Sequence, residues 1–518
     1  MASSAFVTVD AGSQSLRACL IDTQGTLLYA SRSDYEPFIS DEPGQAEYKA
    51  EQFWTACCDA VGSVVRFAHQ HQITPAAIGV TSQRASVVVL DANGTPLRPV
   101  ILWSDQRRCV PPESLGMTGV GMRVIGVHRT VRRFQSDAES NYLALTEPEV
   151  WEQTHKMLFL SGYLNYRLTG LFRDSVANQV GYVPFDYRKQ QWADAQKWHW
   201  RALPFLRPSH LPELIAPGTP LGELSASAAE ALALPSGLPV VACATDKACE
   251  VLGAGCTQHD QACLSFGTAA TVNLTVERYV EVERFVPAYP AAISGRFLCE
   301  EQTHRGFWLV SWFKKEFALA ERQQAHRDGV TPESLFDSFL NQTPPGAEGL
   351  VAQPYWSPGV RVPGPEARGA LIGFNSQHTR AHVYRALLEG LAFSMRQSLE
   401  KIERRTGQRA VSIRVAGGGA QSDAVMQLAA NVLGRTVERG HTHEASSLGA
   451  AICCAVATRA FSDIHQAVTA MTHRGDAFTP HAKTAKMYDR LYRSVYTSMY
   501  ARLKPLYHAL LNLMDRTE

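Results

Sequence analysis

The sequence predicts an α/β protein built of two related domains that face each other across a cleft. Three observations predict this fold: strands alternate with helical segments along the chain, a hairpin with glycine and hydroxyl residues in its turn opens the first half, and a similar hairpin opens the second half. We expect the boundary near Ala244–Gly255, which gives domains of residues 1–250 and 251–518.

The first hairpin lies near the start of the chain. Two alternating apolar runs, Phe6–Val9 and Leu16–Ile21, flank the turn Asp-Ala-Gly-Ser-Gln-Ser. Glycine allows close backbone approach, and successive N–H groups together with hydroxyls can cradle phosphate oxygens. The same residue types also form ordinary turns, so one hairpin alone favours a structural role. A second, matching hairpin shifts the balance toward a phosphate site.

The other elements of the first half follow from periodicity and turn residues. Glu51–Gln70 has apolar residues at helical spacing, and Ala76–Trp103 predicts two strands around an Asn-Gly turn. Glu149–Gly170 predicts a helix that ends at its glycine. The proline-rich Leu211–Leu224 is typical of a linker or surface loop, and Leu238–Ala244 predicts a buried strand.

The second half repeats the pattern. Leu264–Val276 predicts strand, turn and strand; a helix follows through His382–Met395, then a strand at Ile413–Gly417 and a glycine turn before another helix. Tyrosines spaced four residues apart near the end of the chain predict the packed face of a terminal helix: Tyr488, Tyr492, Tyr496 and Tyr500.

Composition excludes several classes of protein. The 518 residues are 45% hydrophobic and 19% charged with a formal net charge of +1, so we expect neither a nucleic acid nor a membrane partner. We find no apolar run of about 18 residues and no signal peptide pattern. Eleven cysteines without a CxxC motif suit reduced thiols, and we expect a cytoplasmic protein.

Two positions suggest chemistry beyond the turns. Asp10 ends the first strand, where a carboxylate can hold a magnesium ion through water. Asp246 follows a buried strand and opens a helix, so it is either a helix N-cap or a base that accepts a proton beside the cleft, and both roles can hold together.

The glycine turn at Val415–Gln427 is neither a GxGxxG fingerprint nor a P-loop, although it suits the base or ribose of a nucleotide. Gln83, Arg84, Asp105 and Arg107 gather around strands, either as edge-strand polar residues with a surface ion pair or as ligand contacts. Trp103 beside them suits either the core or an apolar wall for a sugar face.

Taken in order, these motifs resemble the FGGY carbohydrate kinases, the family of glycerol kinase and xylulokinase. The resemblance runs from about Phe6 to Ala457. The segments that carry it are VDAGSQSLRACLID, GVTSQR, LWSDQR, YLNYRLTG, ATDKACEVLGAG, LSFGTAATVN, ALIGF with YRALLEGLAF, and VAGGGAQSDAVMQLAANVLG with EASSLGAAI. Each alone is weak, but their number and order are specific.

The resemblance implies an actin-like ATPase core (ribonuclease H-like) in each half, with ATP in the cleft and the sugar deeper in the first half. It implies that Asp246 is the base and that Asp10 belongs to the first phosphate hairpin; on physical grounds, the helix start should lower the pKa of Asp246. The positions it implies for ATP are Gly12, Ser13, Gln14, Ser15, Gly267, Thr268, Gly418, Gly419 and Ala420. Those it implies for the acceptor are Gln83, Arg84, Trp103, Asp105 and Asp246.

The acceptor-side residues match no single member of the family. Glycerol kinases have Arg-Glu where this chain has Arg84-Ala85, and xylulokinases have Met-His at Gln83-Arg84. Trp103-Ser-Asp105-Gln-Arg107 resembles the Trp-Asn-Asp-x-Arg of xylulokinases. Lys247 replaces a more usual glutamine or asparagine, and the segment Arg108–Thr146 also departs from the family pattern.

The expected function is therefore an ATP- and Mg²⁺-dependent carbohydrate kinase, with D-xylulose as the first acceptor and xylulose 5-phosphate as the product. The alternatives are a kinase of glycerol or another polyol and, from a different class, an acceptor-independent chaperone-like ATPase or a non-catalytic sugar- or nucleotide-binding protein. The expected partners are ATP or ADP and a small sugar or polyol. The oligomeric state stays open, with a homodimer as one expectation.

Overall fold

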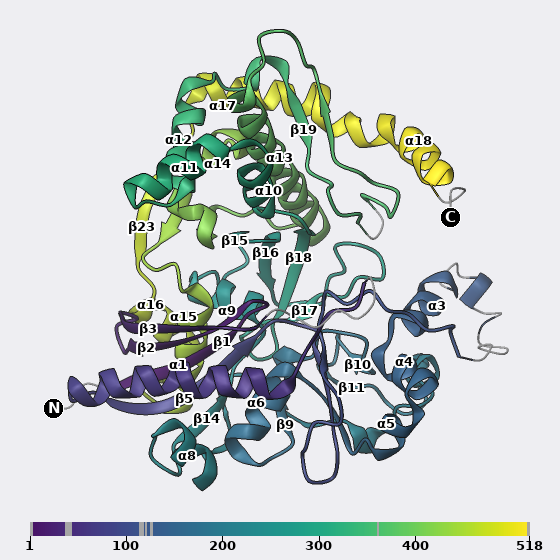
Figure 1. Cartoon of the computed structure of the whole chain (residues 1–518), viewed down its shortest axis with the longest axis vertical. Coiled ribbons are helices and arrows are strands. Elements are labelled where there is room, and N and C mark those ends of the chain that lie inside the picture. The colour runs from purple at the N-terminus through teal and green to yellow at the C-terminus, as the bar shows by residue number, and fades with distance from the viewer. Residues whose placement is uncertain are drawn as a thin grey trace. The chain divides into compact units, whose positions relative to one another are not determined.

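A computed structural model of the chain describes residues 4–36, 44–112, 119, 122–124, 128–359 and 362–514. Its internal contacts divide it into two compact units, each made of segments far apart in the sequence (Figure 1). The first unit is Met1–Thr257, Glu277–Leu298 and Glu444–Thr472; the second is Gln258–Val276, Cys299–His443 and His473–Glu518. The expected functional division at residue 250 stays a prediction.

The main sheet of the first unit has the strand order β13-β14-β5-β1-β2-β3. β1 (Ser4–Ala11) and β2 (Ser15–Asp22) form the predicted antiparallel hairpin, and β5 (Thr74–Ser82) runs parallel to β1. β14 (Pro239–Ala242) runs parallel to β5 and lies within the predicted strand. β3 (Leu27–Asp34) extends the sheet beyond β2.

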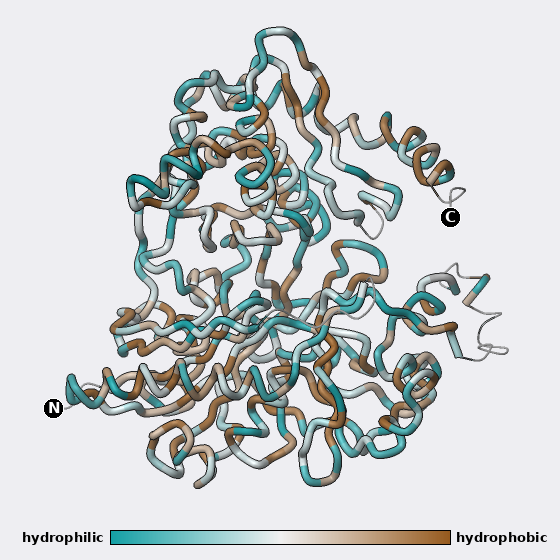
Figure 2. The backbone as a smooth tube through the Cα atoms, viewed as in Figure 1, coloured by the Kyte–Doolittle hydropathy of each residue, from teal (hydrophilic) through white to brown (hydrophobic). Residues whose placement is uncertain are grey.

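Helices cover both faces of this sheet. The predicted first helix is α1 (Ala50–Gln70), which packs through Phe53 and Val61 onto the face formed by residues such as Val7. In Figure 2, α1 alternates between hydrophobic and hydrophilic colours, as expected for a helix with one buried face. On the opposite face α15 (Ala445–Ala457) packs on β1 and β5, so close that a Cβ at Gly79 would overlap the Cys454 thiol.

α15 also packs closely against α9 (Asp246–Gly253), the helix that follows β14. Two glycines make this approach possible. A Cβ at Gly253 would overlap the carbonyl oxygen of Ala445, and a Cβ at Gly449 would overlap that of Cys249. The two helices therefore touch backbone to backbone at the middle and the end of α9.

A second sheet in the first unit has the order β4-β7-β6-β8 and changes two expectations. Residues 76–103 form three strands, because Ala85 has a φ of 55° and the chain leaves β5 before it starts β6 (Val87–Leu90). The helix expected over 149–170 is interrupted by β8 (Lys156–Phe159), whose buried apolar side chains pair with β6. Its predicted end is confirmed, since Gly170 caps α6 with a left-handed φ of 75°.

The residues expected to form a linker or surface loop, 211–224, contain two strands. β12 (Glu213–Ile215) pairs with β9, and β13 (Pro220–Glu223) is the edge strand of the main sheet. Proline is tolerated there because an edge strand has an unpaired side.

The remaining elements of the first unit are β4 (Glu47–Tyr48), β7 (Val100–Ile101), α3 (His128–Asp137), α4 (Glu139–Thr146), α5 (Pro148–Gln153), α6 (Leu160–Thr169), β9 (Arg173–Ser175), β10 (Phe185–Asp186), β11 (Gln191–Trp192), α7 (Trp198–Ala202), α8 (Ala226–Leu232), β17 (Tyr289–Pro290) and α16 (Ile464–Met471). Short 3₁₀ turns lie at Val176–Asn178 and Pro208–His210. Much of the atypical segment between residues 108 and 146 is described, but residues 113–118, 120, 121 and 125–127 lie outside the description.

The second unit is built around strands in the order β18-β16-β15-β21-β22-β23. β15 (Gln261–Phe266) and β16 (Ala270–Val276) form the second predicted hairpin, with Phe266 opposite Ala270. β21 (Ser412–Ala416) runs parallel to β15, as the predicted strand before the glycine turn. The other strands are β18 (Phe297–Thr303), β22 (Val437–Gly440) and β23 (Arg474–Phe478), with β19 (Val351–Gln353) and β20 (Ala370–Ile372) in a separate pair.

Its longest helix, α13 (Arg380–Thr406), is the one predicted through His382–Met395. The terminal helix is also confirmed: α17 (Ala482–Leu491), a π-helical segment (Tyr492–Tyr496) and α18 (Thr497–Met514) follow one another, and Tyr488, Tyr492 and Tyr496 are buried. The remaining helices are α10 (Trp308–Phe317), α11 (Leu319–Asp328), α12 (Pro332–Gln342) and α14 (Asp423–Leu433), with 3₁₀ turns at Ala347–Gly349 and Gly418–Gln421.

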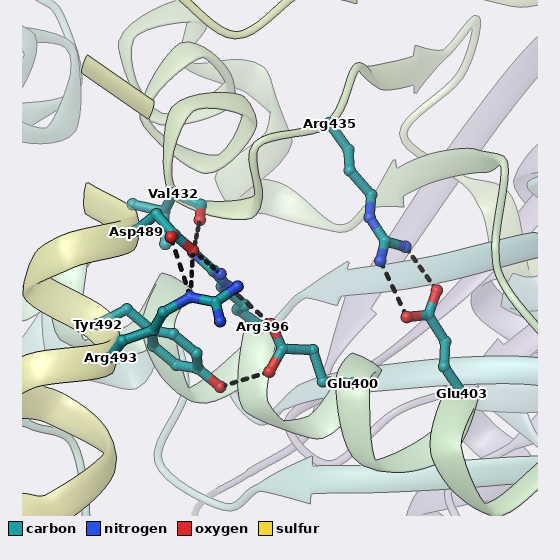
Figure 3. A network of polar contacts seen from close by, with 8 residues as sticks. All are labelled: Arg396, Glu400, Glu403, Val432, Arg435, Asp489, Tyr492 and Arg493. Atoms are coloured by element: carbon teal, nitrogen blue, oxygen red, sulfur yellow. Dashed lines mark hydrogen bonds and ion pairs between the residues drawn. The ribbon is translucent and has the colours of Figure 1, made fainter. Parts of the chain in front are cut away.

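Polar contacts hold the terminal helix to α13 (Figure 3). Arg396 of α13 pairs with Asp489 of α17 and with Glu400, and the hydroxyl of Tyr492 donates to the Glu400 carboxylate at 2.9 Å. The Arg396 guanidinium also lies over the Tyr492 ring. In the described part of the chain, no helix is both long and apolar enough to span a bilayer.

Candidate functional site

The first hairpin turn projects its small residues outward. Ser13 and Gln14 are exposed, and the Gly12 N–H donates to the carbonyl of Ser15 at 3.0 Å, which closes the turn. A Cβ at Gly12 would lie 3.3 Å from that same carbonyl oxygen, so a side chain here would crowd the turn. The turn thus has the compact, exposed backbone that a phosphate cradle needs.

The side chain of Ser13 joins this turn to two residues expected on the acceptor side. Its hydroxyl donates to Gln83 Oε1 at 2.8 Å and accepts from the indole Nε1–H of Trp103 at 2.9 Å. Trp103 is 48% exposed, so the expectation that it belongs to the core is wrong. Gln83 is 4% exposed, and its Nε2 has no hydrogen-bond partner among the described residues.

Arg84 lies on an aromatic platform. Its guanidinium carbon is 5.2 Å from the ring centroid of Tyr289, which in turn makes an edge contact with Tyr187. The next residue, Ala85, has the left-handed φ of 55°, a conformation that is uncommon for a residue with a Cβ. This local strain sets the direction in which the chain passes from Arg84 into β6.

Asp105 and Arg107 form an ion pair, but it is buried instead of superficial. Their side chains are 3% and 8% exposed, and Arg107 also pairs with Glu47 at 2.6 Å. Asp105 accepts from Arg107 Nε, from a terminal Arg107 nitrogen and from the backbone N–H groups of Arg107 and Ala46. All four usual acceptor positions of this carboxylate are therefore occupied by the protein.

Asp246 is the first residue of α9 and is partly buried. The N-cap is Thr245, whose hydroxyl accepts from the Ala248 N–H, so the N-cap alternative for Asp246 is wrong by one residue. The Thr81 hydroxyl of β5 donates to the Ala244 carbonyl at 2.8 Å and ties β5 to the chain just before α9. Asp246 Oδ1 accepts from the Lys247 N–H at 2.7 Å.

The pKa of Asp246 is raised from its ordinary value, whereas the helix start was expected to lower it. Burial is the largest cause; the charges of Lys247 and Arg84 act against it without cancelling it. Lys247 itself does not point away into solvent, because its ammonium pairs with Glu250 at 2.7 Å one turn along α9.

Asp10 lies close enough to Asp246 for their charges to interact. Burial, followed by the charges of Asp246 and Glu444, raises the pKa of Asp10 to about 7, while Arg17 and Lys247 lower it in part. Arg17 faces Asp10 across the hairpin and pairs with Glu444 at 3.2 Å. Carboxylates that repel one another fit a divalent cation, although no cluster of three metal-binding side chains occurs among the described residues.

Arg17 and Glu444 were absent from the predicted site. Arg17 stands only two residues beyond the turn, and the strand register places it opposite Asp10, which the alternation of a hairpin could have shown. Glu444 precedes α15 and is separated from Arg17 by more than four hundred residues. No local sequence pattern indicates that Glu444 lies beside this hairpin.

In the second unit, the second hairpin turn and the glycine turn lie side by side. Gly417 has a φ of 88°, and a Cβ there would crowd the backbone between Phe266 and Gly267. The Gly267 and Thr268 carbonyls accept from the N–H groups of Phe307 and Trp308, which start α10. The 3₁₀ turn Gly418–Gln421 follows directly, so the expected phosphate and adenosine residues of this unit are adjacent.

Comparison with known proteins identifies both halves of the chain. Residues 5–253 match the model of the N-terminal domain of the FGGY family of carbohydrate kinases, and residues 262–458 match that of its C-terminal domain. The actin-like ATPase type of fold expected for the two domains is confirmed by these matches and by solved structures.

The relatives do not agree on one acceptor, and one of them is named only as a sugar kinase. An uncharacterized sugar kinase of Escherichia coli, YgcE, is 28% identical over 95% of this chain and 92% of its own length. A xylulose kinase of Lactococcus lactis is 26% identical over 98% of both chains. The crystal structure of a gluconate kinase from Lactobacillus acidophilus has a TM-score of 0.82 at 20% identity, covering 98% of this chain and 100% of that one.

Proposed function

The chain belongs to the FGGY family of carbohydrate kinases and is an ATP-dependent sugar kinase, and within that activity we propose that it phosphorylates a ketopentose, first of all D-xylulose, to xylulose 5-phosphate. The observation that carries the proposed site is that two carboxylates, Asp10 of β1 and Asp246 at the start of α9, lie close enough for their charges to interact. Phosphoryl transfer asks a protein mainly for positioning and for stabilisation of charge, and one carboxylate suffices to take the proton.

Asp246 is the proposed base. Its carboxylate stands at the start of α9, and burial raises its pKa, which makes it a stronger base than an exposed aspartate. Thr81 ties the Ala244 carbonyl to β5 and Thr245 caps α9 through the Ala248 N–H, so the backbone before and after Asp246 is held, and the Lys247 N–H donates to its carboxylate. Turnover should rise with pH as Asp246 loses its proton, and this acid limb should lie above the ordinary aspartate pKa of 3.8.

In each unit we propose that the backbone of a turn binds phosphate. The first unit supplies Gly12, Ser13, Gln14 and Ser15, and the second supplies Gly267 and Thr268, with Gly418, Gly419 and Ala420 for the adenosine. Asp10 would hold Mg²⁺, which supplies charge neutralisation at the phosphates when bound. The charges of Asp246 and Glu444, which help to raise the pKa of Asp10, support a cation at this place.

On the acceptor side we propose contacts from Gln83, Arg84 and Trp103. The exposed indole of Trp103 offers a face for a sugar ring or carbon chain, and the unpaired Nε2 of Gln83 offers a donor. Asp105, whose acceptor positions are filled by Arg107 and Ala46, supports the loop that carries Trp103.

D-xylulose is favoured by the xylulose kinases among the relatives and by the Trp103-Ser-Asp105-Gln-Arg107 motif. Glycerol or another polyol is the alternative, because this part of the sequence matches neither family pattern fully. Arg84 agrees with the glycerol kinases, but Ala85 stands where they have a glutamate. An acceptor-independent ATPase or a non-catalytic binding protein is the alternative from another class. Such proteins would not need Asp246 together with the Gln83-Trp103 pair.

One assay separates these functions. The purified protein is given Mg-ATP and a panel of ketopentoses, aldoses, aldonates and polyols, and ADP release is measured with each and without any. We expect release to be stimulated by acceptor, most by D-xylulose. Equal ADP release with and without every acceptor would reject the kinase activity and indicate an acceptor-independent ATPase. Stimulation by glycerol alone would identify glycerol, and not D-xylulose, as the acceptor.

A further inference from the structure

Ser13 lies in the turn proposed to bind phosphate, but its hydroxyl is hydrogen-bonded to two side chains proposed to contact the acceptor, Gln83 and Trp103. The hydroxyl bridges Gln83 Oε1 at 2.8 Å and Trp103 Nε1 at 2.9 Å, although these residues come from different loops of the first unit. Both distances are ordinary for strong hydrogen bonds. Ser13 therefore joins the turn to the two side chains proposed to touch the sugar.

The direction of these hydrogen bonds follows from the chemistry of the groups. An indole Nε1–H is only a donor, so Ser13 Oγ accepts from Trp103. The Ser13 proton then points to Gln83, which must present its carbonyl oxygen. This fixes the orientation of the amide and leaves Nε2 as the free donor, in agreement with its lack of a partner among the described residues.

We propose that Ser13 is a positioning residue for the acceptor, and that the phosphate turn holds nucleotide through its backbone instead of through this hydroxyl. The inference rests on the proposed function of Gln83 and Trp103 as acceptor contacts. Ser13 orients the indole through its Nε1–H and the Gln83 amide through its Oε1, which leaves the buried Nε2 of Gln83 as the donor for an acceptor oxygen. The group that meets Gln83 must then be an oxygen with a free lone pair, such as a keto or hydroxyl oxygen.

A split between two Michaelis constants tests this role. In Ser13→Ala the indole and the amide lose their shared partner, so KM for D-xylulose should rise about 3- to 10-fold, the equivalent of one neutral hydrogen bond, while KM for ATP stays within about twofold. Ser13→Thr keeps the hydroxyl and should restore KM for D-xylulose. A rise confined to KM for ATP, equal rises in both constants, or no change in either would overturn the proposal.

A second readout does not depend on turnover. In ¹⁵N-labelled protein without ligands, the Trp103 indole N–H signal is assigned by its loss in Trp103→Phe. We expect this signal to shift upfield in Ser13→Ala and to return in Ser13→Thr, because the hydrogen bond to Ser13 is lost and regained. An unchanged signal would overturn the hydrogen-bond chain itself. If the shift occurs but no acceptor stimulates ADP release, the proposed function fails and the bridging geometry of Ser13 stands.

Discussion

Asp174 is a carboxylate in the first unit that is 1% exposed and held by neutral donors. The donors are Ser161 Oγ, Asn165 Nδ2, Asn178 Nδ2, Gln179 Nε2 and the Ser175 N–H. The loop they form reaches the residue before the proposed base Asp246, because the Ala177 carbonyl accepts from the Thr245 N–H at 3.4 Å. A single buried aspartate thus organises the backbone next to α9.

Replacing Asp174 by asparagine should destabilise the protein. The new N–H₂ group faces donors and cannot accept from them, so we expect a loss of about 1–3 kcal/mol, measured by urea unfolding at pH 7. A variant as stable as the wild type would contradict the donor arrangement.

The stability of the wild-type protein should also depend on pH through the Asp174 carboxyl. Burial raises the pKa of Asp174 from 3.8 to about 6, so the folded state holds its proton longer than the unfolded chain does. The contribution of this carboxyl to stability therefore falls as pH rises from about 4 to 6, and that fall should be absent in Asp174→Asn.

At the scale of elements, the contact between α9 and α15 places the proposed base. The two helices touch at Gly253 and Gly449, where a Cβ would meet the backbone of the partner helix. Gly449→Ala should force the helices apart and cost about 1–3 kcal/mol in unfolding free energy, because overpacked interiors relax poorly.

The matched control is Gly62→Ala, a helical glycine in α1 whose Cβ would lie 3.5 Å from Arg66. That substitution should stabilise the helix by about 1 kcal/mol. Equal effects of the two changes on the urea midpoint would contradict the close contact between α9 and α15.

Sequence periodicity predicted elements well where one pattern dominated. Both hairpins, α1, β14 and α13 follow from alternation or helical spacing. Lys156–Phe159 was missed because a short buried strand has the same continuous apolar character as a buried helix. Asp246 was correctly placed at a helix start, but its pKa shift has the opposite sign, because burial is a tertiary property that outweighs the local helix dipole.

At the scale of the whole chain, the folded units do not follow the order of the sequence. Residues Glu444–Thr472 return to the first unit and bring Glu444 to Arg17 and α15 to the sheet of β1 and β5. No local pattern indicates such a return, so the sequence alone leads to the hairpin turns and Asp246 but not to the charges around Asp10. The family motifs still indicate a carbohydrate kinase, because a motif is recognised by its order along the chain and does not depend on how the units interleave.

If Asp246 takes the proton from the acceptor, Asp246→Asn should abolish most of the turnover without unfolding the protein. The variant keeps the shape of the side chain and leaves the Thr245 cap intact, so its melting curve should match the wild type. Thr245→Ala is the matched control: it should lose about 0.5–2 kcal/mol of stability yet keep the carboxylate and most of its turnover.

The decisive measurement is acceptor-stimulated ADP release at saturating Mg-ATP and saturating acceptor. We predict that kcat of Asp246→Asn falls by roughly 10²–10⁴-fold while ATP binding persists, as expected when a positioned base is removed. An Asp246→Asn protein that melts like the wild type and phosphorylates at the wild-type rate would show that Asp246 is not the base of the transfer.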